Sequence, residues 1–373
     1  MATVAPAVTQ PTRTLPGHYY HDPGIFAREQ ERIIATSWNC VGHVGTIVAP
    51  GAYFLASLAG ESILVVRGRD GEIRAFYNVC RHRASRLCTE ERGQVHASIQ
   101  CRYHAWTYGL DGRLIGAPFM REDPSFDPSQ LGLVPVNLHI WEGLIFVNLS
   151  EHPGSLAEQA PETTHPRVPR YGIAGLRSAK TLIDEVKSNW KLVIANYQEC
   201  AHCAVVHPEL SAKVPDFKAG LTTGGIDDGA EFADGVKTLT ASGASNRSPL
   251  PGLMPEDHHR YYGMMLFPNV FLDMHPDYVV LATLQAVAPD HTRIVTDVLF
   301  HPDTMARADF DPSDAIDFTN LVNQQDWGVC ELSQSGVASR AFRAGGIYGP
   351  HERHIRHLDD LVLEKLGELP PGH

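Results

Sequence analysis

The chain has 373 residues, of which 43% are hydrophobic and 20% charged, and this composition predicts a compact enzyme of about two domains. Its net charge of -12 argues against a nucleic-acid partner, because a duplex binder needs a basic surface to displace the counterions of the phosphates. Residues 1–14 lack the layout of a signal peptide, and no apolar run reaches the roughly 18 residues that cross a bilayer. We therefore expect a cytoplasmic protein with no membrane partner.

The pattern of residues 1–38 predicts an extended segment followed by an amphipathic helix. Apolar side chains recur there at helical spacing with Glu and Arg between them, at Ile25, Phe26, Ile33 and Ile34. A helix with one apolar face needs a partner, and we expect this one to pack on the second domain, at residues 156–373.

The stretch from Asn39 to about Ser150 changes to short runs that alternate between apolar and polar residues. The pairs Asp70-Gly71 and Asp111-Gly112 interrupt these runs and are typical of hairpin turns. Residues 151–170 then carry four prolines and little periodicity, which indicates a crossing between domains. We place an all-β domain at residues 39–155.

Residues 156–373 predict a second domain of mixed structure. A helix is expected around Ser188–Val206, strands around Arg260–Phe300, and a long C-terminal helix from about Ser313 to Phe342. The fold class expected for the whole chain is α+β: an all-β domain, then an α+β catalytic domain with an antiparallel sheet and a long C-terminal helix.

The chain has seven cysteines, an odd number scattered over a long sequence, so we do not expect a disulfide framework. Metal binding is the more informative role to consider for these cysteines. Cys200 and Cys203 have CxxC spacing, but His202 between them and the helical context argue against a thioredoxin-like redox pair. The other cysteines are Cys40, Cys80, Cys88, Cys101 and Cys330.

A first group of candidate ligands consists of a Cys-x-His pair, Cys80 and His82, and a Cys-x-x-His pair, Cys101 and His104. Each pair lies on a turn between short strands, so two hairpin tips could close on one metal centre. Two thiolates and two imidazoles suit a [2Fe-2S] cluster with both histidines on one iron. They also suit a four-coordinate zinc ion.

The run CRHRASRLCTEERGQVHASIQCRYHAWTYGLDG resembles the signature of Rieske iron-sulfur domains. Both arms of that signature read Cys-x-His and Cys-x-x-His, and Tyr103, Trp106 and the turn at Gly109 fit it as well. The resemblance implies that the two cysteines hold one iron of a [2Fe-2S] cluster and the two histidines hold the other.

A second group of candidate ligands lies in the segment SNWKLVIANYQECAHCAVVHPEL. Glu199 and His202 fall one helical turn apart on an inward face, and Pro208 ends the helix so that His207 can turn toward them. Far downstream, Asp326 lies at the edge of an apolar stripe on the long helix. Two histidines and one carboxylate are the ligand set of non-haem iron(II) oxygenases. The stripe consists of Phe318, Val322, Gln325, Val329, Leu332 and Gly336.

These residues resemble the catalytic pattern of Rieske oxygenase α-subunits, which reads Asp/Glu-x-x-His-x4-His followed by a distant Asp. The family's C-terminal helix also resembles a segment of this chain, SRAFRAGGIYGPHERHIRHL, so the likeness extends over nearly the whole chain. The resemblance implies that His202, His207 and Asp326 hold a mononuclear iron. It also implies that Glu199 is no ligand but an electron bridge, joining His202 to the Rieske His104 of the next subunit in a ring, expected to be a homotrimer.

Most of that family has Asp where this chain has Glu199. Glu at this position resembles the subgroup that oxidises choline, carnitine, glycine betaine and proline betaine, although the usual ECYHC reads ECAHC here, with Ala201. The likeness implies O2-dependent N-demethylation of a small quaternary ammonium compound, with electrons supplied by a flavin and iron-sulfur reductase that uses NAD(P)H.

An aromatic cage would hold such an ammonium group by cation-π contact. Candidates for the cage are Trp190, Tyr197, Tyr261, Tyr262, Phe267 and Phe271. The alternative function is a Rieske hydroxylase or dioxygenase of aromatic rings or natural products. A more remote alternative is a zinc-stabilised binding module.

Overall fold

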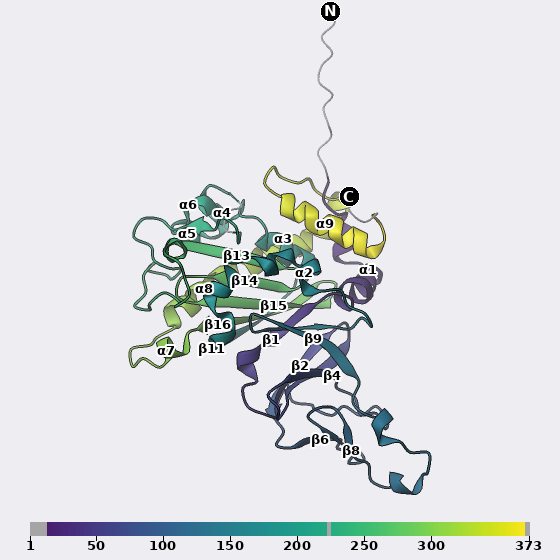
Figure 1. The fold of residues 1–373 in the computed structure, drawn as a ribbon. Coiled ribbons are helices and arrows are strands. Elements are labelled where there is room, and N and C mark those ends of the chain that lie inside the picture. The colour runs from purple at the N-terminus through teal and green to yellow at the C-terminus, as the bar shows by residue number, and fades with distance from the viewer. Residues whose placement is uncertain (1–12, 222–224, 370–373) are drawn as a thin grey trace, which may run out of the picture.

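The computed structural model describes residues 13–221 and 225–369. Within these ranges the strands form three antiparallel sheets, of which the first is built from the N-terminal part of the chain (Figure 1). Its strands are β1 (Asn39–His43), β2 (Ala52–Leu58), β3 (Glu61–Arg67), β4 (Ile73–Tyr77), β5 (Arg92–Gln94), β9 (Pro135–Trp141) and β10 (Leu144–Asn148). They lie in the order β1-β10-β9-β4-β3-β2-β5.

A small sheet lies at the outer end of this domain (Figure 1). It contains β6 (Ser98–Gln100), β7 (Thr107–Gly109) and β8 (Leu114–Gly116). Both expected hairpins are confirmed, because Gly71 joins β3 to β4 and Gly112 joins β7 to β8. Each of these glycines has a φ of 85°, a conformation that other residues rarely adopt.

The third sheet forms the body of the C-terminal half. Its strands are β11 (Arg177–Val186), β12 (Ala230–Glu231), β13 (Arg260–Leu266), β14 (Val270–Met274), β15 (Val279–Ala288) and β16 (His291–Phe300), in the order β11-β16-β15-β14-β13-β12. The α+β fold class is thus confirmed. β11 was not expected, because its sequence RSAKTLIDEV is rich in charge and it lies at the edge of the sheet.

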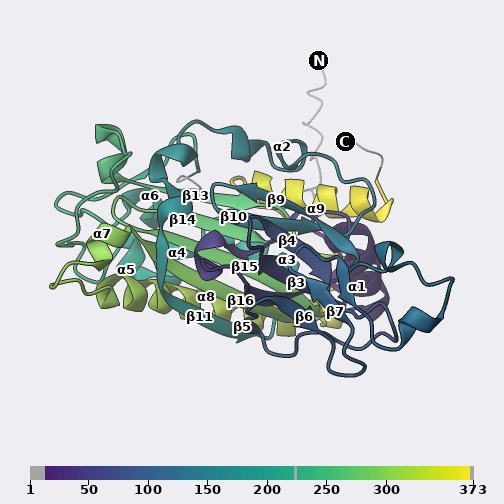
Figure 2. The same ribbon diagram turned by 60° about the horizontal axis from the view of Figure 1, so that its bottom comes forward.

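Helices α3 (Trp190–Tyr197) and α8 (Ser313–Val337) lie against this sheet and against each other (Figure 2). The remaining α-helices are α1 (Pro23–Glu29), α2 (Leu156–Gln159), α4 (Cys203–Val206), α5 (Pro208–Ser211), α6 (Pro215–Lys218), α7 (Pro302–Met305) and α9 (Arg353–Leu366), and a π-helical turn (Gln30–Ile34) continues α1. None of the helices in the described ranges is long and apolar enough to cross a membrane.

The apolar stripe predicted for α8 is correct only in its first half. Phe318 is buried as expected, but Leu332 is 71% exposed. A stripe with steps of four and three has a period of about 3.5 residues and drifts off the face of a straight helix. The side chains that α8 buries toward its C-terminal end are Trp327, Cys330, Gln334 and Val337.

The N-terminal helix packs on the C-terminal half of the chain. Asp22 caps α1 by accepting hydrogen bonds from the backbone N–H groups of its first turn. Arg28 and Arg32 then donate to the carbonyl oxygen of Leu366 at 3.0 and 2.8 Å, which fixes α1 beside α9 (Figure 1).

A buried ion pair makes the tightest link between α1 and α3. Lys191 Nζ lies 2.6 Å from Glu29 Oε1, and both side chains are 0% exposed. Trp190 Nε1 donates to the other oxygen of Glu29 at 2.9 Å. Burial lowers the pKa of Lys191, although the neighbouring carboxylate opposes that shift. Each charge therefore depends on its partner to be tolerated in the core.

Removal of one partner of this pair is expected to destabilise the fold strongly. Lys191→Met leaves the Glu29 carboxylate buried without its cation, which costs about 3–5 kcal/mol. The double variant Glu29→Gln/Lys191→Met removes both charges and is expected to recover most of that loss. Urea denaturation midpoints of the three proteins measure the effect. A single variant as stable as the wild type would show that the pair does not hold α1 in place.

Candidate metal centres

The two loops that carry the first group of candidate ligands have the same conformation. Cys80 follows β4 closely, and Cys101 follows β6 directly. In each loop the N–H four residues after the cysteine donates to the cysteine carbonyl, from Ala84 at 3.1 Å and from Ala105 at 3.0 Å. Both alanines are left-handed, with φ of 56° and 58°. The sequence thus forms two matching turns that face each other.

The histidines of the two loops converge. His82 Nδ1 and His104 Nδ1 lie 3.1 Å apart, and the His82 ring stacks on Trp106 at 4.8 Å between ring centroids. Two ring nitrogens that approach one point in this way fit two imidazoles on a single iron.

The cysteines lie deeper than the histidines, and both are buried. The Tyr108 hydroxyl accepts a hydrogen bond from the backbone N–H of Arg81 at 3.0 Å and lies 3.3 Å from Cys80 Sγ, so its own proton can point at the sulfur. Burial raises the pKa of Cys101, but backbone N–H groups of its loop outweigh that effect and lower it. The loop therefore favours the thiolate, which is the form that binds metal. No pattern in the sequence singles out Tyr108.

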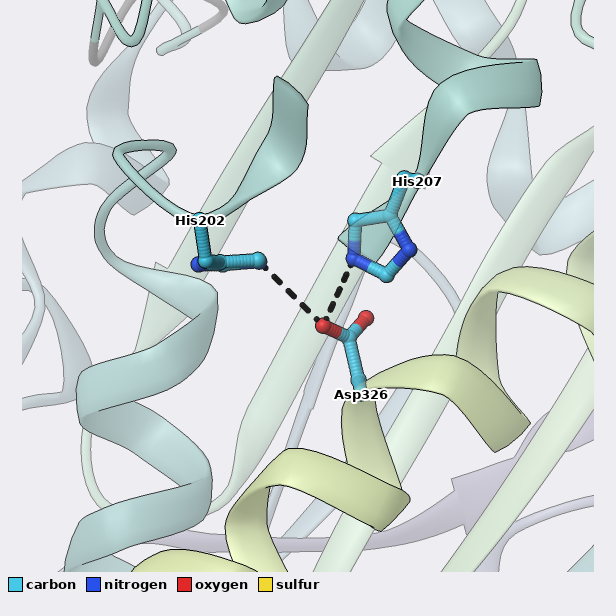
Figure 3. A group of neighbouring side chains, drawn as sticks. All are labelled: His202, His207 and Asp326. Carbon is cyan, nitrogen blue, oxygen red and sulfur yellow. Dashed lines mark hydrogen bonds and ion pairs between the residues drawn. The ribbon is translucent and has the colours of Figure 1, made fainter. Parts of the chain in front are cut away.

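The second group of candidate ligands comes together from three places in the chain (Figure 3). His202 precedes α4, His207 lies between α4 and α5, and Asp326 projects from α8. Asp326 Oδ1 lies 3.3 Å from His202 Nε2 and 2.9 Å from His207 Nε2. One ligand atom from each residue fits within 4.8 Å of the others, so one ion can contact all three.

Neighbouring side chains orient both imidazoles. His202 Nδ1 lies 2.5 Å from Glu199 Oε1, and because a carboxylate only accepts, Nδ1 carries the proton. His207 Nδ1 donates to Gln325 Oε1 at 2.8 Å, while the amide nitrogen of Gln325 donates to Glu209. Each ring thus directs Nε2 toward Asp326, where a metal would bind, which is the usual arrangement around ligand histidines. Gln325 was expected only as part of the apolar stripe.

The electrostatics of this group also fit a cation. Burial lowers the pKa of His202, yet the carboxylates of Asp326 and Glu199 more than compensate and raise it to about 9. Without an ion, protons on the imidazoles balance these carboxylates, and a divalent metal would displace them. Two imidazoles and one carboxylate match the facial ligand set of non-haem iron(II).

The expected helix around Ser188–Val206 is wrong in its second half. α3 ends at Tyr197 and α4 begins at Cys203. Glu199 Oε2 accepts a hydrogen bond from the N–H of Ala201, and this local side-chain bond competes with the helical ladder. A tight turn, rather than a helical face, therefore places Glu199 against His202.

The same turn contains a disulfide. The structure joins Cys200 to Cys203, with Cα atoms 5.0 Å apart, although no disulfide was expected and the CxxC spacing was set aside. The two cysteine side chains can turn toward each other because the chain leaves the helix before Cys200, whereas the prediction assumed an unbroken helix.

A cavity of about 360 Å³ adjoins the triad of His202, His207 and Asp326. Of the six aromatic candidates, three line this cavity: Tyr197, Tyr261 and Phe271. The other three, Trp190, Tyr262 and Phe267, are core residues outside the cavity. The alternation of side chains along β13 turns Tyr262 to the opposite face of the sheet, and Trp190 packs against Phe267. Aromatic residues that the sequence analysis missed are Phe217 and Trp327.

Comparison with known proteins places both halves of the chain. The Rieske [2Fe-2S] domain family matches residues 37–135, and the catalytic domain of the ring hydroxylating alpha subunit family matches residues 165–368. The chain is 31% identical to the glycine betaine monooxygenase oxygenase subunit of Chromohalobacter salexigens, over 98% of this chain and 89% of that protein. It is 28% identical to the carnitine monooxygenase oxygenase subunit of Escherichia coli K12, over 94% and 93%.

A solved structure agrees with this assignment. The quaternary ammonium Rieske monooxygenase CntA in complex with its substrate γ-butyrobetaine superimposes with a TM-score of 0.77 at 26% identity, covering 95% of this chain and 96% of CntA. These matches confirm the predicted Rieske domain and favour it over the alternative of a zinc-stabilised binding module. The chain belongs to the ring-hydroxylating alpha-subunit family of Rieske oxygenases, oxidoreductases that combine a [2Fe-2S] cluster with a mononuclear iron that uses O2.

Proposed function

We propose that this chain is the terminal oxygenase that removes an N-methyl group from a small quaternary ammonium compound. The observation that carries the proposal is the aromatic-lined cavity beside the triad of His202, His207 and Asp326. Relatives that oxidise glycine betaine and carnitine, and the likeness to CntA, support the same substrate class.

The proposed ligands follow from the geometry and the family. Cys80 and Cys101 would hold one iron of the cluster, and His82 and His104 the other. The mononuclear iron would be held by His202, His207 and Asp326. When bound, the cluster supplies electrons one at a time and the single iron activates O2.

The residues around the cavity position the substrate and exclude water. The rings of Tyr197 and Phe271 stack at 4.0 Å between centroids, and Tyr261 meets Phe217 edge to face at 5.8 Å. Such ring faces attract an ammonium group by cation-π contact, which would hold one N-methyl carbon toward the triad.

The overall reaction consumes O2, two electrons and two protons. One oxygen atom enters a C–H bond of the N-methyl group and the other leaves as water. The resulting hemiaminal loses a proton and breaks its C–N bond, which gives formaldehyde and the demethylated amine. We propose a flavin and iron-sulfur reductase that uses NAD(P)H as the source of the electrons.

In Figure 1 the small sheet, beside the first group of candidate ligands, lies at the bottom of the molecule, and α4, beside the triad, lies near the top. Tyr103, beside the cluster loop, is 58% exposed, and Val205, beside the triad, is 85% exposed. We propose that these surfaces meet between subunits of a homotrimer, so that His104 of one chain approaches Glu199 of the next.

The proposed function predicts release of formaldehyde. Iron-loaded protein, supplied with NADPH and a generic reductase, is expected to convert an N-methylated ammonium compound to formaldehyde and an amine lighter by one methylene. A formaldehyde assay and mass spectrometry measure the two products. The matched control replaces the quaternary nitrogen with carbon, which removes the charge and the labile hemiaminal. Turnover of small aromatics without activity on any ammonium compound would favour the aromatic-ring alternative.

A further inference from the structure

We propose that Asp273 supplies the counter-charge for the substrate, and that the cavity therefore selects ammonium compounds with a net positive charge over zwitterions that carry their own carboxylate. This inference rests on the proposed function and narrows its substrate class. It concerns a residue of β14 that the sequence analysis did not single out.

Asp273 lies on the cavity face of the third sheet, between two tyrosines that come from different elements. Its Oδ1 accepts hydrogen bonds from Tyr197 of α3 at 2.6 Å and from Tyr261 of β13 at 2.5 Å. Among the hydrogen bonds and ion pairs of the described residues, none uses its second oxygen, Oδ2. One oxygen is thus fixed, and the other remains available to a ligand.

Gly263 keeps this arrangement open. It pairs with Asp273 across the strands and also lines the cavity. A Cβ atom at this position would lie 2.6 Å from the Tyr261 hydroxyl and 3.1 Å from the Tyr197 hydroxyl, so a larger residue would displace the two donors. The absence of a side chain therefore preserves both the bonds to Asp273 and the free space beside them.

Two hydroxyl donors alone do not identify a ligand site. Asp297 Oδ1 accepts from Ser178 at 2.8 Å and from Thr181 at 2.5 Å, yet it lies outside the cavity. Asp273 differs because it lines a cavity whose aromatic rings could hold a cation. Burial raises its pKa, and the tyrosine hydrogen bonds oppose that shift only in part. A cation bound beside the carboxylate would remove this penalty.

The charges around the cavity decide between a cation and a zwitterion. The acidic residues that line it are Glu162, Glu199, Asp227, Asp273 and Asp326, its histidines are His202, His207 and His354, and none of its described lining residues is Lys or Arg. A metal held by the triad would balance Glu199 and Asp326, but the other three carboxylates outnumber the remaining imidazole of His354. A ligand carboxylate would thus enter an acidic space without a guanidinium or ammonium partner, which is unfavourable. A ligand whose other end is an alcohol, alkyl or ester group avoids that cost.

Calorimetric titration of the iron-loaded protein tests the inference with choline, its neutral carbon isostere 3,3-dimethyl-1-butanol, and glycine betaine. Wild-type protein is expected to bind choline at least about 10-fold more tightly than either of the others. Asp273→Asn keeps the shape and a hydrogen-bond acceptor but removes the charge, and is expected to weaken choline binding about 10- to 100-fold. Affinity for the neutral isostere is expected to stay within about twofold.

Asp297→Asn is the matched control, since it neutralises a carboxylate with the same two-hydroxyl arrangement outside the cavity. It is expected to leave the preference for choline unchanged. Tighter wild-type binding of glycine betaine than of choline would overturn the inference while leaving N-demethylation intact, and this comparison needs no variant. An unchanged preference in a folded Asp273→Asn protein would also overturn it. No binding or turnover of any ammonium compound would instead remove the proposed function itself.

Discussion

Replacement of Glu199 by glutamine is expected to slow the re-oxidation of the reduced cluster by about two orders of magnitude, with iron and sulfide contents close to those of the wild type. The Glu199 carboxylate accepts two hydrogen bonds, from His202 Nδ1 and from the N–H of Ala201. Because these bonds go to different carboxylate oxygens, the single oxygen of an amide can replace only one of them, and the amide carries no charge for the proposed contact with His104 of the next subunit. The ligand atoms themselves are unchanged.

Single-turnover mixing of pre-reduced protein with O2 and substrate measures this rate directly, through the return of the oxidised cluster spectrum. The matched control is Glu185→Gln, which alters a half-exposed carboxylate on β11 that contacts His291 at 2.7 Å. It is expected to re-oxidise at the wild-type rate. Normal re-oxidation in Glu199→Gln, or full activity of a protein that is monomeric at the assay concentration, would remove Glu199 and the route between subunits from the proposal.

Replacement of His202 by alanine is expected to abolish hydroxylation and to release the mononuclear iron, while the visible spectrum of the cluster survives. Wild-type protein is expected to contain about three iron atoms and about two acid-labile sulfides per chain, and the variant about two of each. The reason is that the two ligand groups lie on separate elements: the first on the loops after β4 and β6, the second beside α4 and on α8. Asp326 and His207 alone leave too few protein ligands to retain the ion.

Metal analysis of the wild-type and His202→Ala proteins measures the iron content, and their absorption spectra show whether the cluster is intact. His291→Ala provides a control, because it removes a histidine at the beginning of β16, where its partner is Glu185 rather than a candidate ligand. It is expected to keep both the iron content and the activity. Loss of cluster and single iron together in His202→Ala would contradict two independent centres.

The sequence was informative about the candidate ligands because their spacing is local. The pairs Cys80 with His82 and Cys101 with His104 each lie in one turn, and the residue types alone limited the metal to a cluster or zinc. Asp326 is harder to find, since it lies 119 residues after His207. Its position at the edge of the predicted apolar stripe singled it out, and the family resemblance then implied its role as a ligand. The structure brings these residues together, while their roles as ligands and the domain boundaries at residues 38 and 155 stay predictions.

The failures have physical causes that a pattern of apolar residues does not contain. Gln334 belongs to the buried face of α8 because its side chain accepts from the N–H of Asn189 at 2.9 Å and donates to the carbonyl of Tyr20 at 3.1 Å. A satisfied polar side chain can thus replace the apolar one that periodicity expects. Asp273 was missed for a related reason, since one of its tyrosine partners, on α3, lies 76 residues earlier in the sequence, and the other is on the paired strand β13.

The ion pair of Glu29 with Lys191 joins residues 162 positions apart, and the contact of Arg28 with Leu366 spans 338. During synthesis, the first helix therefore leaves the ribosome long before the residues that cover it. The strands between Asn39 and Asn148 pair among themselves and can fold in the meantime. We therefore expect the strands of residues 39–148 to pair first. Helix α1 can dock only after α9 has been synthesised, although α1 comes first in the sequence.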